Sequence, residues 1–68
     1  MLYTSENPKH IGTVIFVDGV EVLHCFEADT SEGYAICARL NDQGRLYADG
    51  DWVAMEARQG VVTALPPN

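Results

Sequence analysis

The chain has few of the residues that most often carry chemistry. It holds two cysteines among 68 residues, too few for the disulfide framework of a small secreted domain. Four basic residues face ten acidic ones, for a formal net charge of −6. The basic residues are scattered singly, whereas phosphate binding needs a basic stripe that displaces counterions. We therefore expect no direct contact with nucleic acid.

Long apolar runs are also missing. No stretch approaches the roughly 18 apolar residues of a membrane span. Residues 1–6 lack the charged segment and the apolar run of a secretory signal. We therefore expect no membrane contact and an intracellular protein with reduced thiols.

A run long enough for a helix is absent as well, because turn motifs interrupt the chain about every eight to twelve residues. The motifs are Asp18-Gly19, residues 41–44, Asp49-Gly50 and residues 58–60. Asp-Gly tolerates the positive φ of a two-residue hairpin, and a glycine that closes a three-residue loop gives a type I turn with a bulge. We expect positive φ at Gly19 and Gly44.

Runs rich in β-branched and aromatic residues lie between these turns and predict short strands. The predicted strands are 11–17, 20–28, 34–40, 45–48, 52–57 and 61–65. Residues 1–10, broken by Asn7-Pro8, form an N-terminal lead-in, and residues 66–68 form a C-terminal tail. Residues 11–65 are then one all-β domain, an antiparallel meander of five to six short strands. Because such strands twist strongly, we expect a barrel-like or strongly bent sheet.

Turn lengths predict which residues face each other across neighbouring strands. The length of the loop at residues 29–33 is ambiguous by one residue, which leaves open the face of 34–40 that joins the core. The expected pairs are Val17 with Val20, Ile15 with Val22, Leu40 with Leu46, Ala38 with Ala48, Met55 with Thr63 and Val53 with Leu65.

Hydrophobic residues make up 47% of the chain. A domain of this length buries only about 60% of its unfolded surface and usually gains stability from disulfides, metals or oligomerisation. We therefore expect self-association, with a two-fold dimer favoured because it is the commonest arrangement. Residues 11–17 and 61–65 lie near the ends of the meander and are the expected sheet edges.

His24, Cys25 and Cys37 form the one cluster of soft metal ligands, with His10 remote in sequence. Adjacent residues of a strand point to opposite faces, so His24 and Cys25 do not share an ion there. We expect no metal and no cofactor, and two buried, reduced cysteines. Cys25 and Cys37 approach each other across the hairpin only if its loop has an odd number of residues.

Other candidate residues have structural explanations. Asp49 and Asp51 offer oxygen ligands for Ca²⁺, but the spacing of an EF-hand is absent. Ser5 and Ser31 lack the sequence of a nucleophile elbow, and a small meander offers little concavity for a substrate. We expect no catalytic residue and no enzyme.

One further expectation concerns the aromatic residues. Tyr47 and Trp52 flank the Asp49-Gly50 turn, and we expect them to pair across it in a packing role. The alternative, a platform for bases or sugars, would need accompanying basic residues that the chain lacks.

Three segments, residues 17–22, 28–34 and 41–46, resemble small proteins encoded in bacteriophage and prophage genomes. Those proteins are short, all-β and mostly without an assigned activity. The resemblance covers about half of the chain and carries no catalytic residues. It implies a bacterial cytoplasm or a virion as the setting, and a role in binding or assembly.

These observations favour a non-enzymatic phage-type accessory or structural module that self-associates and binds protein. The first alternative is an acidic protein that mimics nucleic acid and inhibits a host DNA- or RNA-binding protein. The second alternative is a small metal-binding or enzymatic domain.

Overall fold

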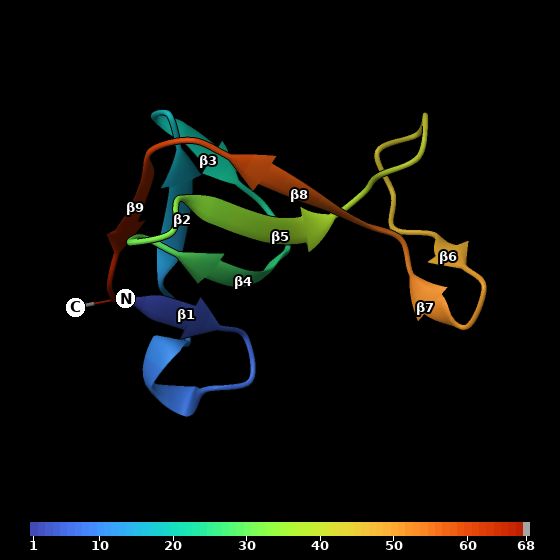
Figure 1. Cartoon of the computed structure of the whole chain (residues 1–68). Helices are drawn as coiled ribbons and strands as arrows, with labels where there is room; N and C mark the ends of the chain where they lie inside the picture. Colours follow the sequence, from blue (N-terminus) through green and yellow to red (C-terminus); the bar gives the residue numbers. More distant parts are fainter. Residues whose placement is uncertain (68) are drawn as a thin grey trace.

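Nine short strands and one 3-10 turn make up the computed structural model, which describes residues 1–67 (Figure 1). The last residue of the predicted tail, Asn68, lies outside the described residues. The elements are β1 (Leu2–Thr4), η1 (Pro8–His10), β2 (Val14–Val17), β3 (Val20–Val22), β4 (Cys25–Asp29), β5 (Tyr34–Ala38), β6 (Ala48–Asp49), β7 (Trp52–Val53), β8 (Met55–Gln59) and β9 (Val62–Leu65).

The strands form three antiparallel sheets. One sheet has the order β1-β4-β5-β8, the second has the order β3-β2-β9, and β6 pairs with β7 alone. The all-β, antiparallel prediction is confirmed. The prediction of one meander of five to six strands is wrong, because the nine strands of residues 1–67 lie in three sheets, and these strands form no closed barrel. No helix among these residues is long and apolar enough to cross a membrane.

Two of the turns predicted from local sequence, at Asp18-Gly19 and at residues 41–44, are present. Asp18 has φ 52° and Gly19 has φ 80°, the two positive values of a type I′ hairpin. Val17 faces Val20 and Ile15 faces Val22, as predicted. Gly44 has φ 74°, and the predicted pair of Leu40 and Leu46 forms an isolated bridge.

The predicted strand 20–28 is wrong as one element, because the chain leaves one sheet and enters the other within it. β3 ends at Val22 and β4 begins at Cys25, in different sheets. His24 between them has φ 55°, a left-handed conformation that breaks the regular extension of a strand. A second irregularity follows at Phe26, the extra residue of a β-bulge opposite β5.

The predicted hairpin at residues 58–60 is also wrong. β8 pairs with β5, and β9 pairs with β2, because the chain crosses from one sheet to the other at Gly60. The Gly60 amide donates to the Gly33 carbonyl at 3.0 Å, and the Val61 amide donates to Asp18 Oδ1 at 2.9 Å. The pairs of Met55 with Thr63, Val53 with Leu65 and Ala38 with Ala48 are therefore not formed; their observed partners are Ala38 with Met55, Phe16 with Thr63, Ala48 with Val53 and Val14 with Leu65.

Two edge predictions have different outcomes. β9 is an edge strand, as expected of residues 61–65, whereas β2 lies between β3 and β9, so the prediction for residues 11–17 is wrong. The lead-in contributes β1, an edge strand that pairs with β4. Asn7 then begins η1 by accepting the Lys9 amide on its side chain at 3.0 Å.

The core is small because several of its side chains are small. Ala35 and Cys37 of β5 point inward, which answers the question of which face of residues 34–40 joins the core. Among residues 1–67, Cys37 is the largest fully buried side chain. The core cluster consists of Ile15, Val17, Val22, Ala28, Ala35, Cys37 and Val62.

Candidate functional site

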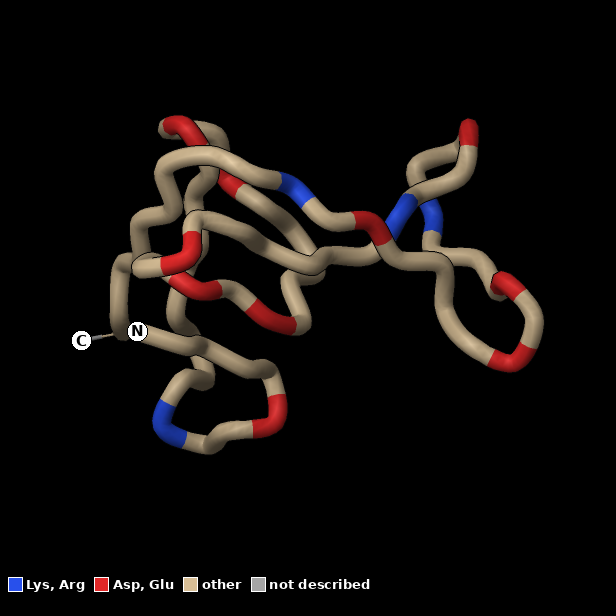
Figure 2. Tube along the Cα trace, in the orientation of Figure 1, with Lys and Arg blue, Asp and Glu red and all other residues tan. Residues whose placement is uncertain are grey.

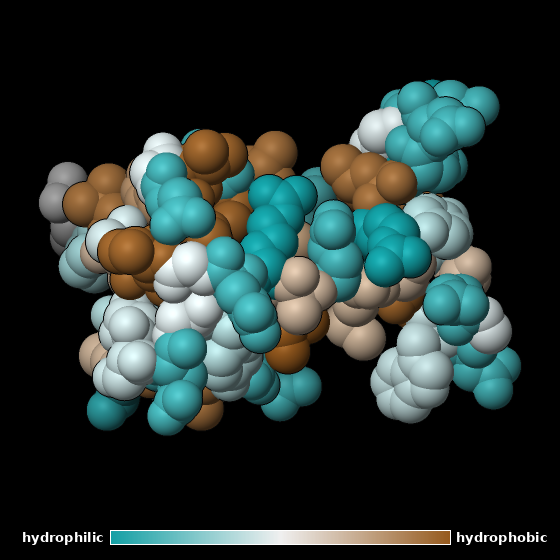
Figure 3. Space-filling view, turned by 45° about the horizontal axis from the view of Figure 1, so that its top comes forward, coloured by the Kyte–Doolittle hydropathy of each residue, from teal (hydrophilic) through white to brown (hydrophobic). Residues whose placement is uncertain are grey.

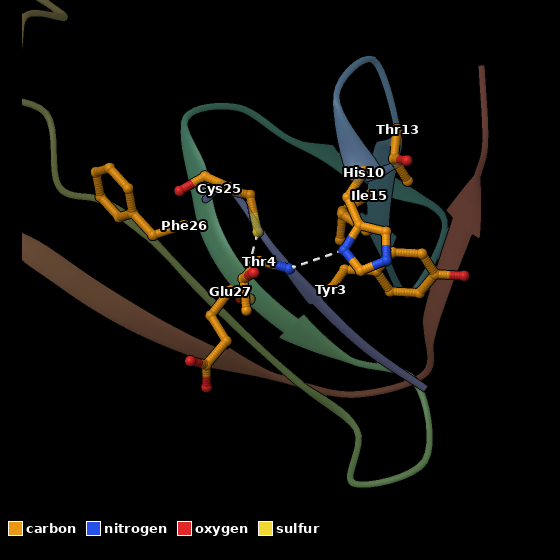
Figure 4. Close-up of a pocket in the computed structure, with 9 residues that line it drawn as sticks. Tyr3, Thr4, His10, Thr13, Ile15, Cys25, Phe26 and Glu27 are labelled. Carbon is orange, nitrogen blue, oxygen red and sulfur yellow. Dashed lines mark hydrogen bonds between the residues drawn. The ribbon is translucent and has the colours of Figure 1, made fainter. Parts of the chain in front are cut away.

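A small cavity lies between β1, η1, β2 and β4, and it holds the chemically most varied group of side chains (Figure 4). His10 Nδ1 accepts the Thr4 amide at 3.3 Å, and the His10 ring lies 4.8 Å from the Tyr3 ring, centroid to centroid. The volume is about 60 Å³, far below the roughly 300–1,000 Å³ of a ligand pocket. The cavity therefore suits a water molecule or two, not a substrate.

Cys25 lies in this cavity, but its surroundings do not activate it as a nucleophile. Its thiol donates to the Glu27 carbonyl oxygen at 3.3 Å, and burial raises the pKa of the thiol. A catalytic cysteine needs a lowered pKa, provided by a nearby cation or a helix N-terminus. In Figure 4 the hydrogen bonds of Cys25 and His10 lead to different partners, so the two side chains form no nucleophile–base pair there.

The other predicted candidates are dispersed. Ser31 Oγ accepts a hydrogen bond from the N-terminal amino group at 3.0 Å. Asp49 and Asp51 are exposed in the β6–β7 hairpin. The residues that the structure describes contain no group of three His, Cys, Asp or Glu side chains placed to hold a metal ion. Trp52 faces Asp49, so the predicted pair of Tyr47 and Trp52 is wrong: the tight turn is Gly50-Asp51, one residue later than expected.

Acidic side chains around Tyr34 are engaged within the fold. The Tyr34 hydroxyl donates to Glu27 Oε2 at 2.6 Å, which raises the pKa of Tyr34 to about 12. Asp29 accepts the amides of Ser31 and Glu32, and the Glu32 amide, as the largest cause, lowers the pKa of the Asp29 carboxyl. Both carboxylates have structural partners, which weakens the interpretation of this face as a mimic of nucleic acid.

The hydrogen bond of Tyr34 predicts a specific loss of stability in alkali. An unfolded tyrosine titrates at about 10, and Tyr34 in the folded chain at about 12. Because the folded pKa is the higher one, the contribution is complete below pH 10 and is lost as the pH rises from 10 to 12. We expect the urea midpoints of the wild type and of Tyr34→Phe to converge over this range. Tyr47→Phe is the control, because Tyr47 is exposed. If the midpoints of the wild type and of Tyr34→Phe differ by the same amount at every pH, the hydrogen bond between Tyr34 and Glu27 does not stabilise the fold as described.

Residues 39–54 project from the four-stranded sheet, and we call this segment the arm (Figure 1). The Arg39 amide donates to the Ala54 carbonyl and the Ala54 amide to the Tyr47 carbonyl, both at 2.9 Å. Asn41 Oδ1 accepts the amides of Gln43 and Arg45. These bonds give the arm a defined backbone, although few of its side chains are buried: Ala54 is only 3% exposed, whereas most of the others face solvent.

The arm exposes large apolar side chains. Trp52 is 76% exposed, and Leu40, Leu46 and Tyr47 are also exposed. Figure 3 shows hydrophobic residues at the surface of the arm as well as of the body. An arm of this kind offers an apolar surface that its own core does not cover.

A groove of about 400 Å³ lies between the arm and the body. The arm side is formed by Trp52 and Val53, with Met55 beside them, and the body side by residues of β1 and β4, including Phe26. Phe26 lines this groove because it is the extra residue of the bulge, which places the neighbouring Cys25, and not Phe26, on the core face. Regular alternation along residues 20–28 would place Phe26 on the same face as the core residue Val22. No local feature of the sequence indicates the bulge.

Comparison with known proteins identifies no relative of this chain. No protein-family model matches the chain, and no curated protein and no solved structure shows significant similarity to it. Inference about function therefore rests on the exposure, shape and chemistry of the chain's own residues.

Proposed function

We propose that this chain is a non-enzymatic accessory or structural module of the bacteriophage or prophage type, which self-associates and binds protein through the arm. The single observation that carries the proposal is the exposure of Leu40, Leu46 and Trp52 on a segment that leaves the core. A two-stranded hairpin by itself is marginally stable in water. Contact with a second surface would order the arm and cover its apolar side chains.

The surface area supports a second copy as the occupant. The chain exposes 4984 Å², whereas a compact monomer of 7.5 kDa is expected to expose about 4,250 Å². The excess of roughly 730 Å² is close to the ≈ 800 Å² that each partner contributes to a standard interface. The radius of gyration, 12.0 Å, likewise exceeds the about 11 Å expected for a compact chain of this length.

Charge limits how two copies can meet. The arm carries Arg39 and Arg45 but also Asp42, Asp49 and Asp51, whereas Glu6 and Glu27 line the body side of the groove (Figure 2). In a two-fold arrangement each arm meets the groove of its partner, so the apolar contact of the arm occurs twice. The sheets of residues 1–67 do not close into a barrel, so they leave an opening between them. In this proposal the second copy also covers that opening.

Sedimentation velocity from low to high micromolar concentration tests the proposal. We expect a reversible dimer whose population grows with concentration, and a larger dimer fraction at high salt, because each copy has a formal net charge of −6 and salt screens the repulsion between copies. A monodisperse 7.5 kDa monomer at high micromolar concentration would reject self-association. Inhibition of a nucleic-acid-binding protein by the monomer would then support the acidic mimic instead.

A further inference from the structure

The two cysteines face each other across β4 and β5. Cys25 and Cys37 are register partners, and the Ala38 amide donates to the His24 carbonyl at 3.0 Å. A hydrogen bond between the flanking residues makes Cys25 and Cys37 a non-hydrogen-bonded pair, the type in which opposite Cα atoms are closest, at about 4.5 Å. That separation falls within the roughly 4.4–6.8 Å that a disulfide spans.

The β-bulge creates this juxtaposition. With regular pairing, Phe26 would stand opposite Cys37; the extra residue moves Cys25 into that place. Both thiols then lie on the core side of the sheet, where Cys37 belongs to the core cluster and Cys25 packs against it. Both cysteines are free in the structure.

We propose that Cys25 and Cys37 are a modification site at which a small-molecule disulfide, of the class of oxidised glutathione, installs a reversible cross-strand disulfide. Cys25 reacts first, because it is half-buried and lines the small cavity, whereas Cys37 is 1% exposed. The Cys25 thiolate attacks one sulfur of the reagent, forms a mixed disulfide and releases one small thiol.

Ring closure completes the exchange. The Cys37 thiolate attacks Cys25 Sγ, and the second small thiol leaves. Two protein thiols are thereby oxidised, one small disulfide is reduced to two thiols, and the two protons pass to the released thiolates. Closure requires the Cys25 thiol to give up its hydrogen bond to the Glu27 carbonyl. Burial raises the pKa of both thiols, so we expect a slow exchange.

The disulfide would lie close to two turning points of the backbone. Cys25 follows His24, where the chain passes from one sheet to the other, and Cys37 lies two residues before Arg39, where the arm leaves β5. Oxidation would therefore fix the base from which the arm projects. Because this inference rests on the register of β4 and β5, it holds whether or not the arm forms a dimer.

Equilibration of the reduced full-length chain in glutathione buffers of increasing oxidising strength tests the proposal, with acid quenching, alkylation and mass spectrometry. We expect a single-chain product, with no disulfide between chains, that is lighter by two hydrogen atoms and free of alkylated thiols, and whose thermal midpoint is raised by roughly 10 °C. Cys37→Ser should stop at a glutathione adduct on Cys25, and Cys25→Ser should react only when it unfolds.

Three results would overturn the proposal. The first is a stable glutathione adduct as the end product of the wild type. The second is a disulfide between chains in place of one within the chain. The third is formation of the bond only in denaturant, which would show that the native register does not bring the thiols together.

Discussion

Gly33→Ala is expected to destabilise the protein by roughly 3 kcal/mol or more, enough to leave a domain of this size partly unfolded. Gly33 has φ 73°, and a Cβ atom there would lie 2.8 Å from the Gly60 carbonyl oxygen. The left-handed conformation alone costs alanine about 1–2 kcal/mol. The remaining cost arises because the obstructing atom belongs to the backbone and cannot rotate away.

Gly19→Ala is the matched control for this substitution. Gly19 has a similar φ of 80°, but apart from its chain neighbours no atom of residues 1–67 lies within 4 Å of the position that a Cβ atom would take. Only the conformational cost of about 1–2 kcal/mol therefore applies. Urea denaturation of both variants measures the difference. Equal losses of stability would show that Gly33 and Gly60 do not approach each other as described.

This corner of the molecule explains why one predicted hairpin is absent. Gly60 hydrogen-bonds to Gly33, and Val61 exchanges hydrogen bonds with Asp18, so three distant turns meet there. A local motif such as residues 58–60 is compatible both with a hairpin and with a crossing between sheets. The choice depends on residues far along the chain, which local pattern does not contain.

Short-range features can be predicted because they depend only on residues that are neighbours in the sequence. The hairpin at Asp18-Gly19 and the positive φ of Gly44 follow from the steric freedom of glycine and from the side-chain acceptors beside it. The change of strand direction at His24 has no such signal, because a histidine with φ 55° is recognisable only once the two sheets are known.

The arm shows a further limit of hydrophobic patterning. Residues 45–48 and 52–57 have the composition of core strands, yet Leu46, Tyr47 and Trp52 are exposed. Apolar side chains meant for a core and for an interface look alike in sequence. Composition predicts excess apolar surface for the chain as a whole, and the structure shows that one part of this surface, with Trp52 as its most exposed side chain, lies on the arm.

Trp52→Ser is expected to weaken the proposed dimer about 30- to 100-fold, as for a tryptophan at the centre of an interface, where truncation costs about 2 kcal/mol or more. The monomer should keep its stability to within about 0.5 kcal/mol, because the side chain is 76% exposed. A loss of association without a loss of stability separates an interface residue from a core residue.

Ile11→Ser is the matched control, since Ile11 is 70% exposed but lies on the body, next to η1. Sedimentation equilibrium of the wild type, Trp52→Ser and Ile11→Ser gives the dissociation constant of each dimer. Trp52 is also the one tryptophan of the chain, so its emission in the wild type should shift to shorter wavelength as the concentration rises and the indole leaves water. If the emission stays that of an exposed indole while dimers form, or if Ile11→Ser breaks the dimer and Trp52→Ser does not, the arm is not the interface.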